Sequence, residues 1–135
     1  MRKENWPRIL EQYISKHKGK PFVRGENDCC TFSGGAADAI SDSQLVAELR
    51  RIAGDYTSDI AAARAIISVG SIDQHLDKIL QSIPVKMAQR GDFVYFDETD
   101  SLAIVSMDGK HGVCPYEDDL RYFPIDEAIK AWRIE

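Results

Sequence analysis

The chain has 135 residues, of which 44% are hydrophobic and 29% charged, a composition typical of one globular domain with one core. The formal net charge of −5 argues against general binding to nucleic acid or anionic membranes, because both favour a basic surface. No apolar run approaches the roughly 20 residues that span a bilayer. The N-terminus, MRKENWPRIL, lacks the apolar segment of a secretory signal. We therefore expect a single domain over residues 1–135, made in the cytoplasm, with no membrane span and no nucleic-acid partner.

Helical spacing of apolar residues characterises the first half of the chain. A first helix is expected to begin after Asn5 and to end before Gly19. A second is expected to begin after Asp28, a good N-cap, and to continue to about Ile40. Shorter helices are predicted at about 43–52, 58–67 and 72–80.

Two adjacent glycines interrupt the second predicted helix. Each glycine costs a helix roughly 1 kcal/mol relative to alanine, and Gly34-Gly35 therefore predicts that another backbone or side chain comes close at this point.

The periodicity changes after residue 90, where β-branched and aromatic residues alternate with turn residues. We predict an antiparallel meander with strands at about 93–96, 102–107 and 112–114. A last helical turn is expected at 126–130, followed by a closing strand in AWRI. Helices first and strands afterwards predict an α+β domain with N-terminal helices packed on a small antiparallel sheet.

The segment FVRGENDCCTF places two of the three cysteines where the second helix begins. If Asp28 is the cap, Cys29 is the first helical residue, and its sulfur lies near unpaired backbone N–H groups and the positive end of the helix dipole. Both favour the nucleophilic thiolate. The alternative is that both cysteines are small buried apolar residues, which is their commoner role.

The combination of PFVRGENDCCTF with a later RGDFVYF and LAIVSMDG resembles the NlpC-type papain-like cysteine peptidases. Those enzymes cut peptide bonds in the stem peptides of bacterial cell walls. The resemblance implies a papain-like fold in which a cysteine begins a helix and a Gly-Asp pair opens the sheet. The PF, DC and RGD segments and the C-terminal AWR also resemble a phage-tail family of unknown function.

By this resemblance, Cys29 stands at the position of the nucleophile, and Ser101 stands where the family has its base histidine. Serine cannot accept a proton from a thiol near neutral pH, so the nucleophile–base pair is incomplete. The resemblance also makes Asp28, Arg24 and Asp92 candidates for substrate binding, although Arg24 stands where relatives tend to carry an aromatic residue.

His111 is a candidate substitute for the missing base, because it follows the strand that Ser101 opens. The alternative is an exposed histidine in the turn DGKHG. A metal site built from Cys29, Cys30, Cys114 and His111 lacks the paired spacing of zinc ligands. The acidic run Glu117 to Asp119 reads as a solvated turn rather than a calcium loop. We expect no metal and no cofactor.

Two functions remain open at this stage. The first is a structural or assembly component of a phage tail tip or hub with a degenerate catalytic site, made in the host cytoplasm and then carried in the virion. Its partners would be other tail proteins. The second is an active cysteine peptidase that cleaves cell-wall peptide during phage entry.

Overall fold

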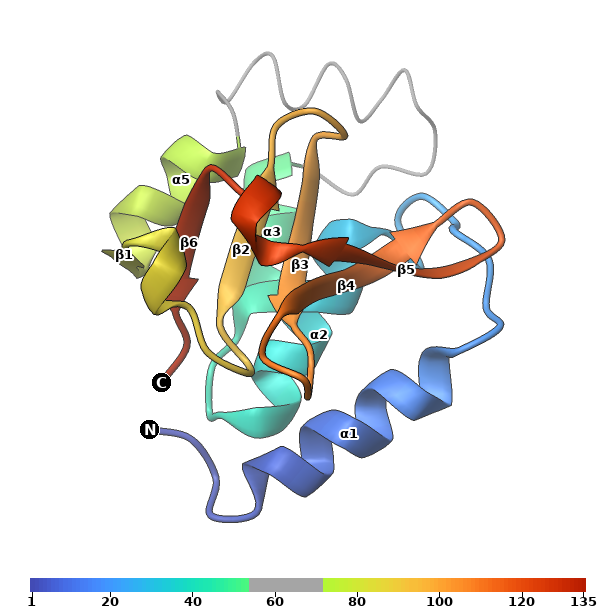
Figure 1. The fold of residues 1–135 in the computed structure, drawn as a ribbon, viewed down its shortest axis with the longest axis horizontal. Coiled ribbons are helices and arrows are strands. Elements are labelled where there is room, and N and C mark those ends of the chain that lie inside the picture. The colour runs from blue at the N-terminus through green and yellow to red at the C-terminus, as the bar shows by residue number, and fades with distance from the viewer. Residues whose placement is uncertain (54–71) are drawn as a thin grey trace.

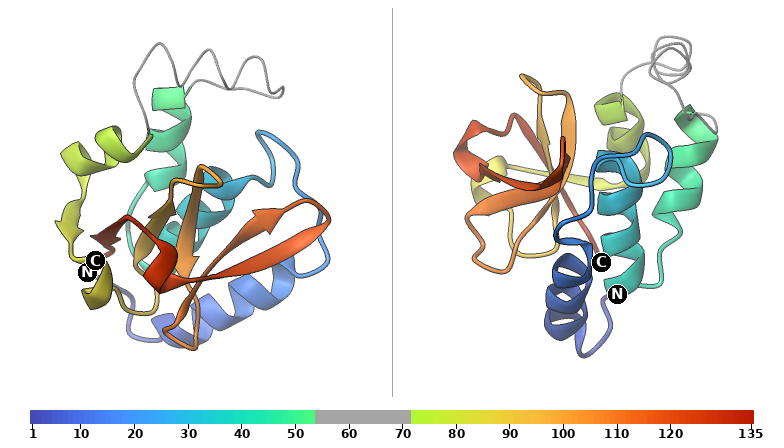
Figure 2. Two further views of the ribbon diagram at one scale, coloured as in Figure 1. Left: turned by 45° about the horizontal axis from the view of Figure 1, so that its top comes forward. Right: turned by 90° about the vertical axis from the view of Figure 1, so that its right-hand side faces the viewer.

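A computed structural model describes residues 1–53 and 72–135, which form a layer of helices on one face of a sheet (Figures 1 and 2). The described helices are α1 (Trp6–His17), α2 (Cys29–Ile40), α3 (Leu45–Ala53) and α5 (Ile72–Ile79). The described strands are β1 (Gln81–Ile83), β2 (Phe93–Phe96), β3 (Ser101–Val105), β4 (His111–Tyr116), β5 (Asp119–Pro124) and β6 (Lys130–Arg133). None of the described helices combines the length and apolar character needed to cross a membrane.

The described strands pair antiparallel in the order β1-β6-β2-β3-β4-β5. The predicted α+β class and the meander from β2 to β4 are confirmed. The sequence did not reveal two edge strands. β1 has three residues, and β5 is largely exposed and follows the acidic turn, so neither carries a strong apolar pattern.

The helical turn predicted at 126–130 is a short 3-10 helix, η2 (Ile125–Glu127), and Lys130 already belongs to β6. A second 3-10 helix, η1 (Val85–Met87), precedes β2. The helix predicted at 58–67 lies outside the described residues.

The glycine pair in α2 makes room for two neighbouring helices. A Cβ at Gly34 would lie 3.2 Å from side-chain carbons of Val46 and Leu49 on α3. A Cβ at Gly35 would overlap the hydroxyl of Tyr13 on α1, which donates a 2.9 Å hydrogen bond to the Phe32 carbonyl. The close approach that the glycines predicted is therefore confirmed, and it holds α2 between α1, α3 and the sheet.

Asp92 joins the two ends of the chain. Its side chain is fully buried and forms ion pairs with Arg2 at 2.7 Å and Arg133 at 3.2 Å. The backbone N–H groups of Gln89 and Ile134 donate to the same carboxylate. Arg2 also donates to the carbonyl of Ile134, which explains why both termini lie close together in Figure 1.

Candidate functional site

The start of α2 is built around the carboxylate of Asp28, which is 1% exposed. It accepts hydrogen bonds of 2.8 Å from the backbone N–H groups of Thr31 and Gly25, while the Thr31 hydroxyl accepts from the Asp28 N–H. This reciprocal capping box fixes where the helix begins. Cys29 is consequently the first residue of α2, as predicted.

The sulfur of Cys29 lies 4.0 Å from the sulfur of Cys30, and the thiol is close to Leu102 of β3. The pKa of Cys29 is lowered, first because the Cys30 thiol hydrogen-bonds to its sulfur and also because the backbone N–H of Leu102 does so. Burial opposes this shift. One turn further along α2, the hydroxyl of Ser33 donates to the Leu102 carbonyl at 2.9 Å. This bond ties α2 to β3 beside the thiol of Cys29.

Cys29 opens onto a cleft of about 350 Å³. One wall is the loop before α2, which contributes Phe22 and Arg24, with the guanidinium 5.1 Å from the centre of the Phe22 ring. The turns between β2 and β3 and between β4 and β5 form the rest. Those turns and the adjoining strand ends contribute Thr99, Asp100, Ser101, Pro115, Tyr116 and Glu117.

Ser101 is the first residue of β3 and lines this cleft together with Cys29, as the resemblance implied. Its hydroxyl donates to the Thr99 carbonyl at 3.2 Å and also interacts with the thiol of Cys114 on β4. Burial is the main reason why the pKa of Cys114 is raised, and the neighbouring Cys29 adds to it. At this place the cleft has a hydroxyl backed by a thiol whose pKa is raised.

The histidines of the chain lie elsewhere. The sequence contains three, and none of them lines the cleft among the residues described. His111 is the first residue of β4, whereas Pro115 and Tyr116, which line the cleft, are the last two. Its Nδ1 lies 2.6 Å from the Asp108 carboxylate. The structure therefore does not bring His111 to Cys29.

Of the three residues predicted to bind substrate, one lines the cleft and two do not. Arg24 lines the cleft. Asp28 and Asp92 do not, because the first is used to cap α2 and the second holds the chain ends together. Asp28 therefore supports the site by fixing the start of α2, and neither carboxylate lines the cleft.

Sequence reasoning did not assign a place in the site to Cys114 or Thr99. Cys114 was considered only as a metal ligand, and the interaction that places it beside Ser101 depends on how β4 pairs with β3. Thr99 contributes a buried hydroxyl oxygen that makes no hydrogen bond in the structure. No pattern in the turn DETDS distinguishes this hydroxyl from a solvated one.

The cleft can supply a nucleophilic thiolate, a guanidinium and two carboxylates. Hydrolysis of a peptide by cysteine also needs a group that takes the thiol proton and delivers it to the leaving amine, commonly a histidine. Among the described residues, no group of three or more histidine, cysteine or acidic side chains could hold a metal ion. The thiolate can react with a soft electrophile, but the site lacks the base that acyl transfer usually needs.

This geometry defines an α+β domain of the NlpC type, with a cysteine beginning a helix that packs on an antiparallel sheet. A crystal structure of the NlpC/p60 domain of the peptidoglycan hydrolase SagA resembles it with a TM-score of 0.58 and 14% sequence identity, covering 94% of this chain and 97% of that one. At this identity the likeness establishes the fold. Residues 1–134 match the family described as "Domain of unknown function (DUF6950)", and the chain belongs to that family. No curated protein matches it.

Proposed function

We propose that the protein is a structural or assembly component of a bacteriophage tail, at the tip or hub, that uses an NlpC-type fold with a degenerate catalytic site. The observation that supports the loss of catalysis is the replacement of the expected imidazole by Ser101, beside Cys29. The phage assignment is supported by the resemblance of PFVRGENDC, RGD and AWR to a phage-tail family. In this proposal the chain is made in the host cytoplasm, assembles with other tail proteins and is carried in the virion.

The degenerate site is tested by incubating the purified protein with bacterial cell-wall sacculi and measuring released peptides by mass spectrometry. Cys29→Ser is the matched variant. We expect the wild-type protein to release no more peptide than the variant. Release that depends on Cys29 would overturn the proposal of a degenerate site.

The tail assignment is tested separately, by mass spectrometry of phage particles purified from a strain that encodes the chain. We expect the chain to be present in intact particles and retained after the tails are isolated. Particles that form and infect normally without it would contradict the assignment.

A second function, an active cysteine peptidase for cell-wall peptide, is favoured by one observation. The pKa of Cys29 is lowered and its sulfur opens onto a cleft, so a nucleophile is present. Such an enzyme would have to obtain its proton acceptor from the substrate or from another protein. The sacculus experiment, repeated with assembled tails, distinguishes this case, because activity would then appear only in the assembly.

A further inference from the structure

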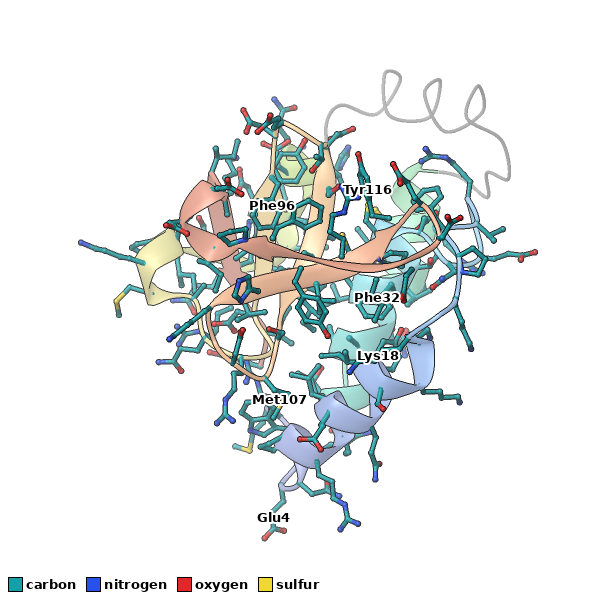
Figure 3. All side chains as sticks on the ribbon, turned by 45° about the vertical axis from the view of Figure 1, so that its right-hand side comes forward. Glu4, Lys18, Phe32, Phe96, Met107 and Tyr116 are labelled. Atoms are coloured by element: carbon teal, nitrogen blue, oxygen red, sulfur yellow. The ribbon has the colours of Figure 1, made fainter. Side chains whose placement is uncertain are left out.

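A groove unrelated to the cysteine cleft lies where η1 and η2 meet the turn that joins β3 to β4, and we call it the η1–η2 groove. Its volume is about 580 Å³, and four of the residues that line it are apolar: Val85, Ala88, Ile125 and Ala128. Among the described residues, none lines both this groove and the cleft at Cys29. Figure 3 shows Met107 of the β3–β4 turn and Tyr116 of the cleft at opposite ends of the β4–β5 hairpin, so the two sites are separate.

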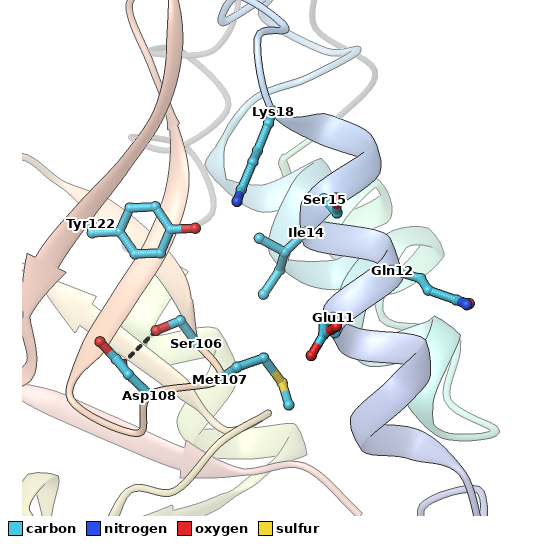
Figure 4. A pocket seen from close by; sticks show the side chains of 9 residues that line it. All are labelled: Glu11, Gln12, Ile14, Ser15, Lys18, Ser106, Met107, Asp108 and Tyr122. Atoms are coloured by element: carbon cyan, nitrogen blue, oxygen red, sulfur yellow. Dashed lines mark hydrogen bonds between the residues drawn. The ribbon is translucent and has the colours of Figure 1, made fainter.

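The turn between β3 and β4 is fixed by hydrogen bonds. Its Asp108 carboxylate accepts from the Ser106 hydroxyl at 2.7 Å and from two backbone N–H groups, one of them that of Lys110. Figure 4 shows this turn from the side on which residues 106–108 line a separate pocket beside α1. The Lys110 carbonyl accepts from the Ile125 N–H at 3.0 Å, which joins the turn to η2. Backbone hydrogen bonds therefore hold two sides of the groove together.

Two large apolar side chains next to the groove are exposed. Met87 of η1 and Ile129, just after η2, are each 52% exposed. Each is the sequence neighbour of a residue that lines the groove. The Arg133 guanidinium donates to the Met87 carbonyl at 3.4 Å and ties η1 to β6. Exposed apolar groups that gather in one place, with charged residues around them, are typical of surfaces that bind another protein.

The charged residues of the groove have no partners within the described part of the chain. Lys86, Lys110 and Asp126 line it, and Glu127 follows Asp126 in η2. All four residues are exposed, and none of their side chains forms an ion pair or a hydrogen bond with a described residue. Two cations and two anions around one groove would both attract and repel a ligand of a single charge. A surface that carries both signs can pair with all of them.

A second copy of this chain carries such a surface. In a contact with twofold symmetry both copies use the same patch, so each pair of facing residues occurs twice. A patch with equal numbers of positive and negative groups can therefore pair with itself. Apolar burial supplies most of the affinity in such a contact, and the charges select the partner and the register.

We propose that the η1–η2 groove is the interface of a twofold-symmetric dimer of this chain. In the dimer, Lys110 of one copy lies opposite Asp126 of the other, and Lys86 lies opposite Glu127. The facing copy covers the exposed side chains of Met87 and Ile129. The dimer depends neither on the tail assignment nor on chemistry at the cysteine cleft, and its test is independent of both.

The test is sedimentation velocity of the purified full chain at a series of micromolar concentrations. We expect a reversible equilibrium between monomer and dimer, with no larger species. Met87→Asp should weaken the dimer at least about tenfold, because it places a charge in the apolar part of the contact. A chain that stays monomeric at every concentration would overturn the proposal. Species that grow beyond the dimer would also overturn it, since they indicate a head-to-tail contact.

Charge reversals test the pairing of the two copies. Lys110→Glu and Asp126→Lys should each weaken the dimer at least about tenfold, since each places like charges opposite one another twice. An equimolar mixture of the two variants should recover the dimer, because every reversed charge then meets its complement. Lys16→Glu, an exposed change on α1, is the control and should leave association unchanged. Failure of the mixture to recover the dimer, or equal weakening by Lys16→Glu, would refute the assignment.

Discussion

The backbone N–H of Leu102 on β3 helps to lower the pKa of the Cys29 thiol, and it thereby favours the thiolate as an imidazolium does in a cysteine peptidase. A backbone N–H can stabilise negative charge, but it cannot accept a proton. The site therefore has a group that stabilises the thiolate but no histidine that accepts its proton, and these two features can be tested separately.

The first prediction concerns the contact between the two adjacent thiols. Cys30→Ala should raise the pKa of Cys29, because the Cys30 hydrogen bond is the largest cause of its lowering. With the pKa raised, the rate of alkylation of Cys29 by iodoacetamide should reach its plateau at higher pH than in the wild-type protein. The measurement is the alkylation rate at each pH, followed residue by residue by mass spectrometry.

Cys114→Ala is the control for this prediction. The pKa of Cys114 is raised, so its thiol is uncharged while Cys29 titrates, and removing it should move the Cys29 profile little. Identical profiles for the wild-type protein and Cys30→Ala would show that the thiol contact does not set the reactivity.

The second prediction concerns the buried carboxylate that joins the chain ends. Asp92→Asn should lower the free energy of unfolding by about 2–3 kcal/mol. Breaking a fully buried pair costs about 3–5 kcal/mol, but Arg2 and Arg133 keep partial access to water. Urea denaturation followed by circular dichroism measures the change.

An exposed aspartate in the turn after β2 provides the comparison for Asp92. Asp97→Asn should change the free energy of unfolding by less than about 0.5 kcal/mol. Equal stability of the Asp92 and Asp97 variants would refute the structural role that we assign to Asp92.

The third prediction concerns the capping of α2. Asp28→Ala should lower the free energy of unfolding by about 2 kcal/mol, since the change removes the cap and leaves the half-buried N–H of Gly25 without its acceptor. Asp28→Ser should cost less, because a serine oxygen can still accept from Thr31. Asp42→Ala, in an exposed position, is the control. If Asp28 acted by binding substrate, its removal would leave stability unaltered in the same urea titration.

The fourth prediction uses the contact between α1 and α2. Gly35→Ala should destabilise the protein by about 1–3 kcal/mol, because the added methyl overlaps the Tyr13 hydroxyl in a packed interface. In a Tyr13→Phe background the same change should cost at least about 1 kcal/mol less, since the overlapping atom is gone. Thermal and urea denaturation of all four members of this double-mutant cycle provide the test. A cost that is the same in both backgrounds would contradict the contact.

Much of the fold could be predicted from local pattern. Asp28 followed by CCTF predicted where α2 begins, and the structure confirms it, because a capping box forms from residues within one turn of each other. The runs of β-branched and aromatic residues predicted β2, β3 and β4, because this pattern is also local to each strand. Strand β5 was missed, since an exposed edge strand derives its pairing from a neighbour and not from its own apolar content.

The candidate site could be predicted only in part. The resemblance assigned Cys29 and Ser101 to one site, and both line the cleft. It also suggested binding roles for Asp28 and Asp92, which the fold buries. The conformation of the turn that precedes β4 is set by hydrogen bonds from Ser106 and two backbone N–H groups to Asp108. Those bonds keep His111 at the end of β4 that is remote from the cleft, and no spacing in the sequence encodes the separation between His111 and Cys29.

The sequence by itself determined the class of fold, the start of the cysteine helix and the absence of a histidine at position 101, because each depends on neighbouring residues or on the identity of one residue. Only the tertiary structure decided what surrounds the Cys29 sulfur, that Cys114 lies behind Ser101, and that η1 and η2 form a groove with the β3–β4 turn. These relationships join elements far apart in the chain, and packing between helices and strands sets them.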